Sequence, residues 1–156
     1  MLFVTLFAVT AGMAQEKPYT VVFYNLENLF DIYDDPETHD EEFLPDGVKQ
    51  WNETKYQKKL SNMERVLFDI AAQQKEYPIV IGVSEIENRT VLEDLISQPK
   101  LKGGNYRICH YDSPDARGVD VAFLYRADVF KLKGSDNIKL DVPELPDFRT
   151  RDLVVM

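Results

Sequence analysis

Two segments of the chain share one form, an apolar strand-like run that ends in a turn of acidic and amide residues. They are residues 19–28 (YTVVFYNLEN) and 78–88 (PIVIGVSEIEN). If the two strands are neighbours in one sheet, their ends bring Asn25, Glu27 and Glu85 to the same edge. Carboxylate and amide oxygens gathered there form a hard-oxygen site that suits Mg²⁺ or Mn²⁺. A divalent ion at such an edge points toward phosphate-ester chemistry.

Periodicity predicts the other elements. Apolar residues at three- and four-residue steps predict a helix over residues 53–74, with Asn52 as its N-cap. A second helix is predicted over 88–97, with Asn88 as its cap. Further strands are predicted over 106–111, 119–125, 129–132 and 138–140, and from residue 151 onward. Segment 31–51 is acidic and interrupted by prolines, and we expect a solvated loop there rather than a calcium site.

Composition indicates one ordinary globular domain. The chain has 156 residues, of which 44% are hydrophobic and 29% are charged. A net charge of −9 argues against a protein that coats nucleic acid by bulk charge. It permits an enzyme with a local basic patch beside a metal ion, because the ion supplies positive charge. Cys109 is the single cysteine, so no internal disulfide forms, and we expect it to be buried.

The N-terminus predicts export. Residues 1–14 (MLFVTLFAVTAGMA) are apolar and uncharged, too short to span a bilayer, and end in small residues that a signal peptidase accepts. The segment is therefore interpreted as a signal peptide, with the domain over 15–156 and a periplasmic or extracellular bacterial location. No stable membrane insertion is expected after cleavage. The alternative is a buried N-terminal strand.

Three blocks, taken in order, resemble the endonuclease/exonuclease/phosphatase superfamily, which includes deoxyribonuclease I. They are residues 24–31 (YNLENLFD), 81–88 (IGVSEIEN) and 112–122 (DSPDARGVDVA). The order and spacing of these blocks resemble bacterial exported members. The resemblance extends over 19–156 but covers only the N-terminal part of the family's domain. It implies an α/β fold, a four-layer α/β sandwich of two mixed β-sheets flanked by helices. It also implies a metal-dependent phosphoesterase.

The resemblance also implies roles for individual residues. Glu85 resembles the family's principal metal-binding glutamate, and Asn25 resembles its asparagine beside the scissile phosphate. Glu27 occupies the acidic place two residues on, so Mg²⁺ (or Mn²⁺) is expected on Glu85 and Glu27. Arg117 falls where family members place a side chain that meets substrate phosphate. Asp120 is left open between a structural partner and a site residue.

Some of the family's catalytic segments have no counterpart here. These are the Asn-x-His segment, the Asp-x-Asn turn and the C-terminal Asp-His pair, and neither His39 nor His110 lies in a block that would replace them. We therefore expect the chain to be the N-terminal part of a longer protein and inactive alone, with the general base beyond Met156.

The leading hypothesis is an exported, Mg²⁺-dependent phosphodiesterase, an endonuclease acting on DNA or RNA as a monomer. A local basic track along a nucleic-acid backbone would consist of Lys100, Lys102, Arg107, Arg117 and Arg126. Two alternatives stay open. One is a phosphatase or phospholipid-type phosphodiesterase on the same metal site, and the other is a non-catalytic, metal-stabilised binding module.

Overall fold

A mixed four-stranded sheet organises the chain. The computed structural model describes residues 19–145 and 147–156, so the expected signal peptide lies outside the described residues. The strands are β1 (Val21–Leu29), β2 (Val80–Ile86), β3 (Tyr106–His110) and β4 (Asp120–Arg126), in the order β1-β2-β4-β3. β1 and β2 run parallel, whereas β4 is antiparallel to both β2 and β3. The C-terminal ends of β1 and β2 therefore meet at one edge, as the sequence predicted.

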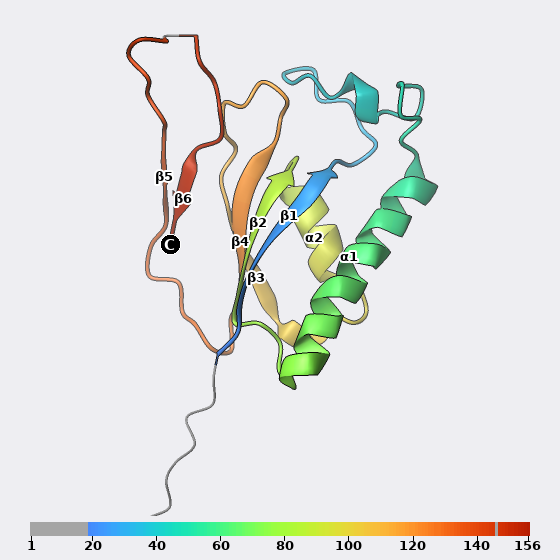
Figure 1. Ribbon diagram of the computed structural model, residues 1–156, viewed down its shortest axis with the longest axis vertical. Coiled ribbons are helices and arrows are strands. Elements are labelled where there is room, and N and C mark those ends of the chain that lie inside the picture. Colours follow the sequence, from blue (N-terminus) through green and yellow to red (C-terminus); the bar gives the residue numbers. More distant parts are fainter. Residues whose placement is uncertain (1–18, 146) are drawn as a thin grey trace, which may run out of the picture.

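Two helices cover one face of this sheet (Figure 1). They are α1 (Glu53–Gln74) and α2 (Arg89–Ile96), close to the predicted ranges. Both predicted caps are confirmed: the side chain of Asn52 accepts the N–H of Lys55, and that of Asn88 accepts the N–H of Val91. The core between sheet and helices includes Leu26, Leu60, Leu67, Ile81, Val83, Ile86, Leu92, Leu95 and Leu124. Cys109 is buried, as expected.

A smaller sheet lies on the other side of the main sheet (Figure 1). It pairs β5 (Asp136–Ile138) with β6 (Leu153–Val155), and two short 3-10 turns are η1 (Glu41–Phe43) and η2 (Lys102–Gly104). The strand predicted at 129–132 is wrong. The chain turns there, because the N–H groups of Val129 and Phe130 both donate to the carbonyl of Arg126. The α/β class is confirmed, and the four-layer sandwich stays a prediction.

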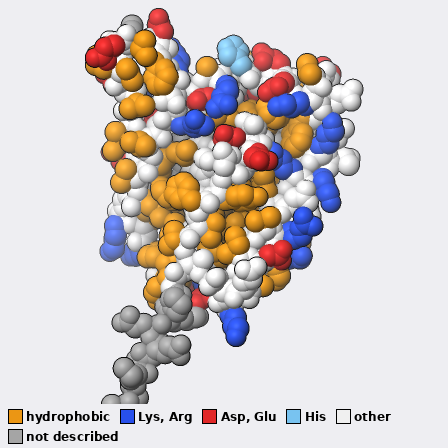
Figure 2. Space-filling model, viewed as in Figure 1, with side chains coloured by type: hydrophobic (Ala, Val, Ile, Leu, Met, Phe, Trp, Pro, Cys, Tyr) orange, Lys and Arg blue, Asp and Glu red, His pale blue; other side chains and the backbone are white. Residues whose placement is uncertain are grey.

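The sheet face opposite the helices is apolar and partly open. Phe23 and Val21 are 76% and 64% exposed. Figure 2 shows hydrophobic side chains gathered over the middle of the molecule, with several Lys and Arg side chains along the side where α1 lies. Gly82 lies beneath Phe23, and a Cβ at Gly82 would lie 2.5 Å from the Phe23 ring, so a larger residue there would displace this exposed ring. No helix within the described residues is long and apolar enough to cross a bilayer.

Hydrogen bonds join the two turns that follow β1 and β2. The N–H of Glu87 donates to the carbonyl of Leu29 (3.1 Å), and the N–H of Asp31 donates to Glu87 Oε2 (2.7 Å). Asn88 Nδ2 donates to Asp31 Oδ2 (3.1 Å) while its Oδ1 caps α2. The sequence predicted a solvated loop over 31–51, and this prediction is wrong in part, because Asp31 and Asp40 are buried. Their carboxylates accept backbone N–H groups of the loop itself, which offsets the cost of burial.

Glu87 is the titratable group most affected by this arrangement. Burial raises the pKa of the Glu87 carboxyl to about 8, against a partial lowering by the N–H of Asp31. The carboxylates of Asp31, Asp40 and Asp35 raise the Glu87 pKa further. Glu87 therefore holds a proton at neutral pH, and this proton reduces the negative charge between the two turns.

We expect the stability of the protein to fall as pH rises from about 5 to about 8. The folded state keeps a proton on Glu87 that the unfolded state has already lost, so the free energy of unfolding decreases by up to about 1.4 kcal/mol per pH unit in this window. Glu87→Gln carries no titrating proton and keeps an oxygen for the Asp31 N–H, so its stability should be flatter over the same range. Urea denaturation at several pH values measures this. A Glu87→Gln variant whose stability falls as steeply as that of the wild type would contradict it.

Candidate functional site

The end of β1 is irregular where its acid-and-amide turn begins. Regular pairing with β2 reaches Asn25 and Ser84 and resumes only at Leu29. Glu27 (φ 51°) and Asn28 (φ 61°) both lie in the left-handed region. The N–H of Glu27 donates to Asn25 Oδ1 (2.7 Å), which closes the turn. Left-handed backbone at a residue other than glycine costs about 1 kcal/mol or more, so the surrounding contacts must hold this turn in place.

The end of β2 has a matching irregularity. Glu85 has φ 58° and lies between Ser84 and Ile86, whose partners on β4 are consecutive residues. The unpaired Glu85 is therefore a β-bulge, which changes the direction of its side chain relative to the regular alternation. Because Ser84 is the partner of Asn25, the bulge lies directly beside the turn of β1. The structure brings Asn25, Glu27 and Glu85 to one edge.

A lysine from α1 supports this edge. Lys59 Nζ donates to the carbonyl of Glu27 (2.5 Å) and to that of Asn28 (3.1 Å). Burial lowers the pKa of the Lys59 ammonium, and the carboxylates of Glu27 and Glu85 act in the opposite direction. Both carboxylates thus lie within electrostatic reach of one ammonium. The sequence presented Lys59 only as a polar residue of an amphipathic helix, and helical periodicity carries no signal for its contact with β1.

A basic groove runs from this turn along α1. Its volume is about 530 Å³, and it is lined by Tyr24, Glu27, Trp51, Thr54, Lys55, Lys58, Lys59, Asn62, Met63, Arg65 and Val66. The cations next to the carboxylates are therefore those of α1, which the sequence did not single out. In the basic track expected after the second helix, Arg126 is instead occupied by ion pairs with Glu76 (3.1 Å) and Asp128.

Arg117 does not join the other predicted residues. Its Nε lies 3.5 Å from Asp115 Oδ1, and its backbone N–H donates to the same oxygen (3.0 Å). Within residues 19–145 and 147–156, Arg117 forms no hydrogen bond or ion pair with Asn25, Glu27 or Glu85. The Arg117 side chain is 56% exposed, so it faces solvent from the loop before β4.

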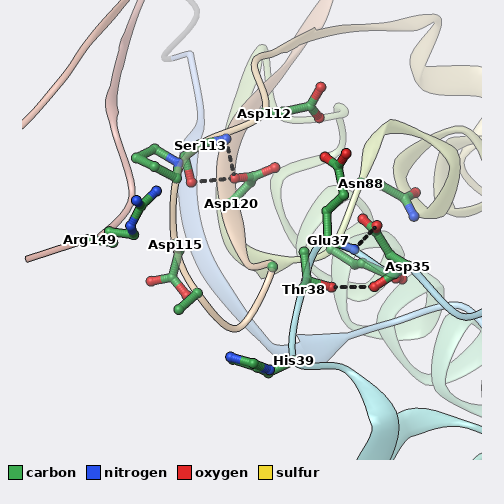
Figure 3. Close-up of a pocket in the computed structure, with 14 residues that line it drawn as sticks. Asp35, Glu37, Thr38, His39, Asn88, Asp112, Ser113, Asp115, Asp120 and Arg149 are labelled. Carbon is green, nitrogen blue, oxygen red and sulfur yellow. Dashed lines mark hydrogen bonds between the residues drawn. The ribbon is translucent and has the colours of Figure 1, made fainter. Parts of the chain in front are cut away.

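An acidic cavity of about 560 Å³ lies beside the same end of the sheet (Figure 3). Loops 35–39 and 112–118 form its walls, with Glu87, Asn88, Asp120 and Arg149. Figure 3 shows Asp35 bonded to its own loop and Ser113 bonded to Asp120.

Asp120, left open by the sequence, is a buried partner of His110 and Ser113. Asp120 Oδ2 lies 2.9 Å from His110 Nε2, and Asp120 Oδ1 accepts both the N–H (2.9 Å) and the hydroxyl (2.6 Å) of Ser113. Among the described residues, His110, Asp112 and Asp120 bring their ligand atoms within 4.8 Å of one another. The sequence signal for this group is the short spacing His-x-Asp, followed by Asp120.

The donors at the β1–β2 edge fit a hard divalent cation. Mg²⁺ is bound through one or two carboxylates and keeps several waters, so Glu27 and Glu85 are a sufficient pair. Glu27 is exposed and Glu85 is half-buried, so both are open to water. The carboxamide of Asn25 adds a neutral group beside them.

Lys59→Met should destabilise the protein by about 2 kcal/mol, because it removes two charged hydrogen bonds to the β1 turn. Lys58→Met is the matched control. Lys58 is exposed and has no hydrogen-bond or charge partner within the described residues, so its replacement should change stability by less than about 0.5 kcal/mol. Urea denaturation measures both, and amide hydrogen exchange at residues 26–29 should be faster in Lys59→Met alone. Equal stability of the two variants would show that Lys59 does not hold the turn.

Comparison with protein families matches residues 20–156 to the Endonuclease/Exonuclease/phosphatase family. Searches of curated proteins and of solved structures gave no match. The matched range includes both bulged turns, the basic groove and the loop that bears Arg117. Members of this family are generally hydrolases of phosphoesters that depend on a divalent metal. The chain belongs to the endonuclease/exonuclease/phosphatase family.

Proposed function

We propose that this protein hydrolyses phosphodiesters with Mg²⁺ or Mn²⁺ bound at the β1–β2 edge, and that its substrate is nucleic acid. The observation that supports this best is the pair of bulges, which holds Glu27 and Glu85 in left-handed conformations at neighbouring strand ends. Strained residues of this kind cluster at functional sites, where the surrounding fold maintains them.

Glu85 and Glu27 are the residues that would hold the cation, which when bound neutralises charge on the non-bridging phosphate oxygens. Asn25 has a separate task. Its Oδ1 accepts the N–H of Glu27, which fixes the direction of the carboxamide. Its Nδ2 has no hydrogen-bond partner within the described residues, so it is available to donate to a phosphate oxygen. A neutral donor orients the phosphate without adding negative charge.

Two positively charged features suit a phosphodiester chain. The groove beside Glu27 is lined by Lys55, Lys58, Lys59 and Arg65 of α1, at spacings that place them along one side of the helix. Arg117 offers an exposed planar guanidinium that can bind two phosphate oxygens at once. A polyanionic backbone would use both, whereas a small phosphoester would not extend along the groove.

The net charge of −9 favours the competing substrate class, a small phosphoester. Plasmid DNA and bis(p-nitrophenyl) phosphate, each assayed with the full-length protein in Mg²⁺ and in chelator, separate the two. Cleavage of DNA supports the nucleic-acid proposal, and cleavage of the small ester alone assigns a phosphatase or phospholipid-type activity. Metal binding by the full-length protein without any turnover assigns a binding module.

Glu85→Gln should weaken Mn²⁺ binding by about tenfold or more, because it replaces a charged ligand by a neutral amide. Calorimetric titration with Mn²⁺ measures this without requiring turnover, and any Mg²⁺-dependent hydrolysis should be lost in parallel. Glu37→Gln is the matched control, because Glu37 is exposed on a different loop and loses the same charge. If the two variants bind Mn²⁺ equally, Glu85 does not hold the ion.

Arg117→Ala should raise KM for DNA about tenfold with little change in stability, since its side chain is exposed and meets only its own loop. Arg149→Ala provides a comparison in the neighbouring cavity. Steady-state kinetics of the full-length protein at fixed salt test this. A KM that is unchanged in Arg117→Ala removes this residue from substrate binding.

A further inference from the structure

We propose that His110, Asp112 and Asp120 form a second cation site, which takes a transition metal such as Zn²⁺. It uses none of the residues assigned to the β1–β2 edge, although Asp120 pairs with Ile86 next to the Glu85 bulge, and it does not depend on the function proposed above. It would use one imidazole nitrogen and two carboxylates as ligands, and it would open toward the acidic cavity.

The three ligand atoms already lie at distances that suit a shared ion. His110 Nε2 is 2.9 Å from Asp120 Oδ2 and 3.9 Å from Asp112 Oδ1, and all three lie within 4.8 Å of one another. Tetrahedral ligands at about 2.1 Å from a zinc ion are about 3.4 Å apart. The observed separations lie on either side of this value, so small side-chain movements suffice to close the site.

One side of the site is buried and hydrogen-bonded. The side chains of His110 and Asp120 are only 3% and 5% exposed. Asp120 Oδ1 accepts the N–H and the hydroxyl of Ser113, so its Oδ2 is directed at the imidazole. Ligating carboxylates are commonly held by such outer hydrogen bonds, which orient them for the metal.

The other side of the site is open. The Asp112 side chain is 92% exposed and, together with Ser113 and Asp120, borders the cavity drawn in Figure 3. Within the described residues, the Asp112 carboxylate accepts no hydrogen bond. A metal ion entering from the cavity would meet Asp112 first and would leave a further coordination position for water.

The charges of the group favour a cation over a purely structural contact. One imidazole faces two carboxylates, so the group has an excess of negative charge even when His110 is protonated. A structural imidazole–carboxylate pair requires Asp120 alone and has no use for Asp112. The contribution of Asp112 therefore distinguishes a cation site from a structural pair.

The donor set also predicts which metal binds. Imidazole nitrogen suits Zn²⁺, whereas Mg²⁺ prefers sites made of oxygen alone. We therefore expect the two sites to prefer different ions, with Zn²⁺ on the imidazole site and Mg²⁺ at the β1–β2 edge. A bound ion would join the end of β3, the start of β4 and the loop between them that bears Arg117.

The chain contains two histidines, which makes the test direct. Zn²⁺ alone is titrated into untagged, ¹⁵N-labelled protein, and the imidazole resonances of His110 and His39 are followed by NMR. We expect a saturable shift of His110 Nε2, with His39 unchanged as the internal control. The same shift should occur in Glu85→Gln, which keeps the result independent of the metal proposed at the β1–β2 edge.

Asp112→Asn should weaken Zn²⁺ binding at His110 by about tenfold or more. It should not unfold the protein, because the Asp112 side chain is exposed. Glu37→Gln removes the same charge from the same cavity and should bind Zn²⁺ as the wild type does. The proposal is overturned if His110 does not respond to Zn²⁺, if His39 responds in its place, or if Asp112→Asn and Glu37→Gln bind equally.

Discussion

The positions of both turns at this edge are set by the hydrogen bonds that join Asp31, which follows β1, to Glu87 and Asn88, which follow β2. Asp31 N–H binds Glu87 Oε2, and Asn88 Nδ2 binds Asp31 Oδ2, across more than fifty residues of sequence. Both turns contain left-handed residues that an isolated strand end would not maintain. Because each turn is hydrogen-bonded to the other, neither can relax alone. The two carboxylates proposed to hold a metal are therefore positioned by groups that do not themselves touch it.

Repulsion between the carboxylates at this end of the sheet is reduced in two ways. At the edge itself, the ammonium of Lys59 lies within reach of Glu27 and Glu85 and reduces their mutual repulsion. Behind the edge, Glu87 retains its proton at neutral pH because burial raises its pKa to about 8. Both effects reduce the repulsion among the acids that this chain, with a net charge of −9, gathers at one end of the sheet.

The parts of the fold that local pattern could predict were those where the pattern was long or had a specific cap. Helix α1 shows six turns of regular periodicity and an Asn52 cap, and both are confirmed. The apolar run at 129–132 was too short to predict a strand correctly. It follows Arg126, whose carbonyl receives two N–H groups and whose side chain pairs with Asp128, so the chain turns instead of extending. Local hydrogen bonding decided the outcome there over hydrophobic pattern.

Local sequence was enough to place acids and amides after two apolar strands, because strand ends and turn residues are encoded locally. It also predicted that Asn25, Glu27 and Glu85 would meet if those strands were neighbours. The folded chain was needed to show that these strands are neighbours, that Lys59 of α1 supports the turn, and that Asp120 lies against His110. These contacts join residues far apart in the chain or depend on a strand register, and they arise from packing the sheet and helices together. No periodicity within a single segment contains that information.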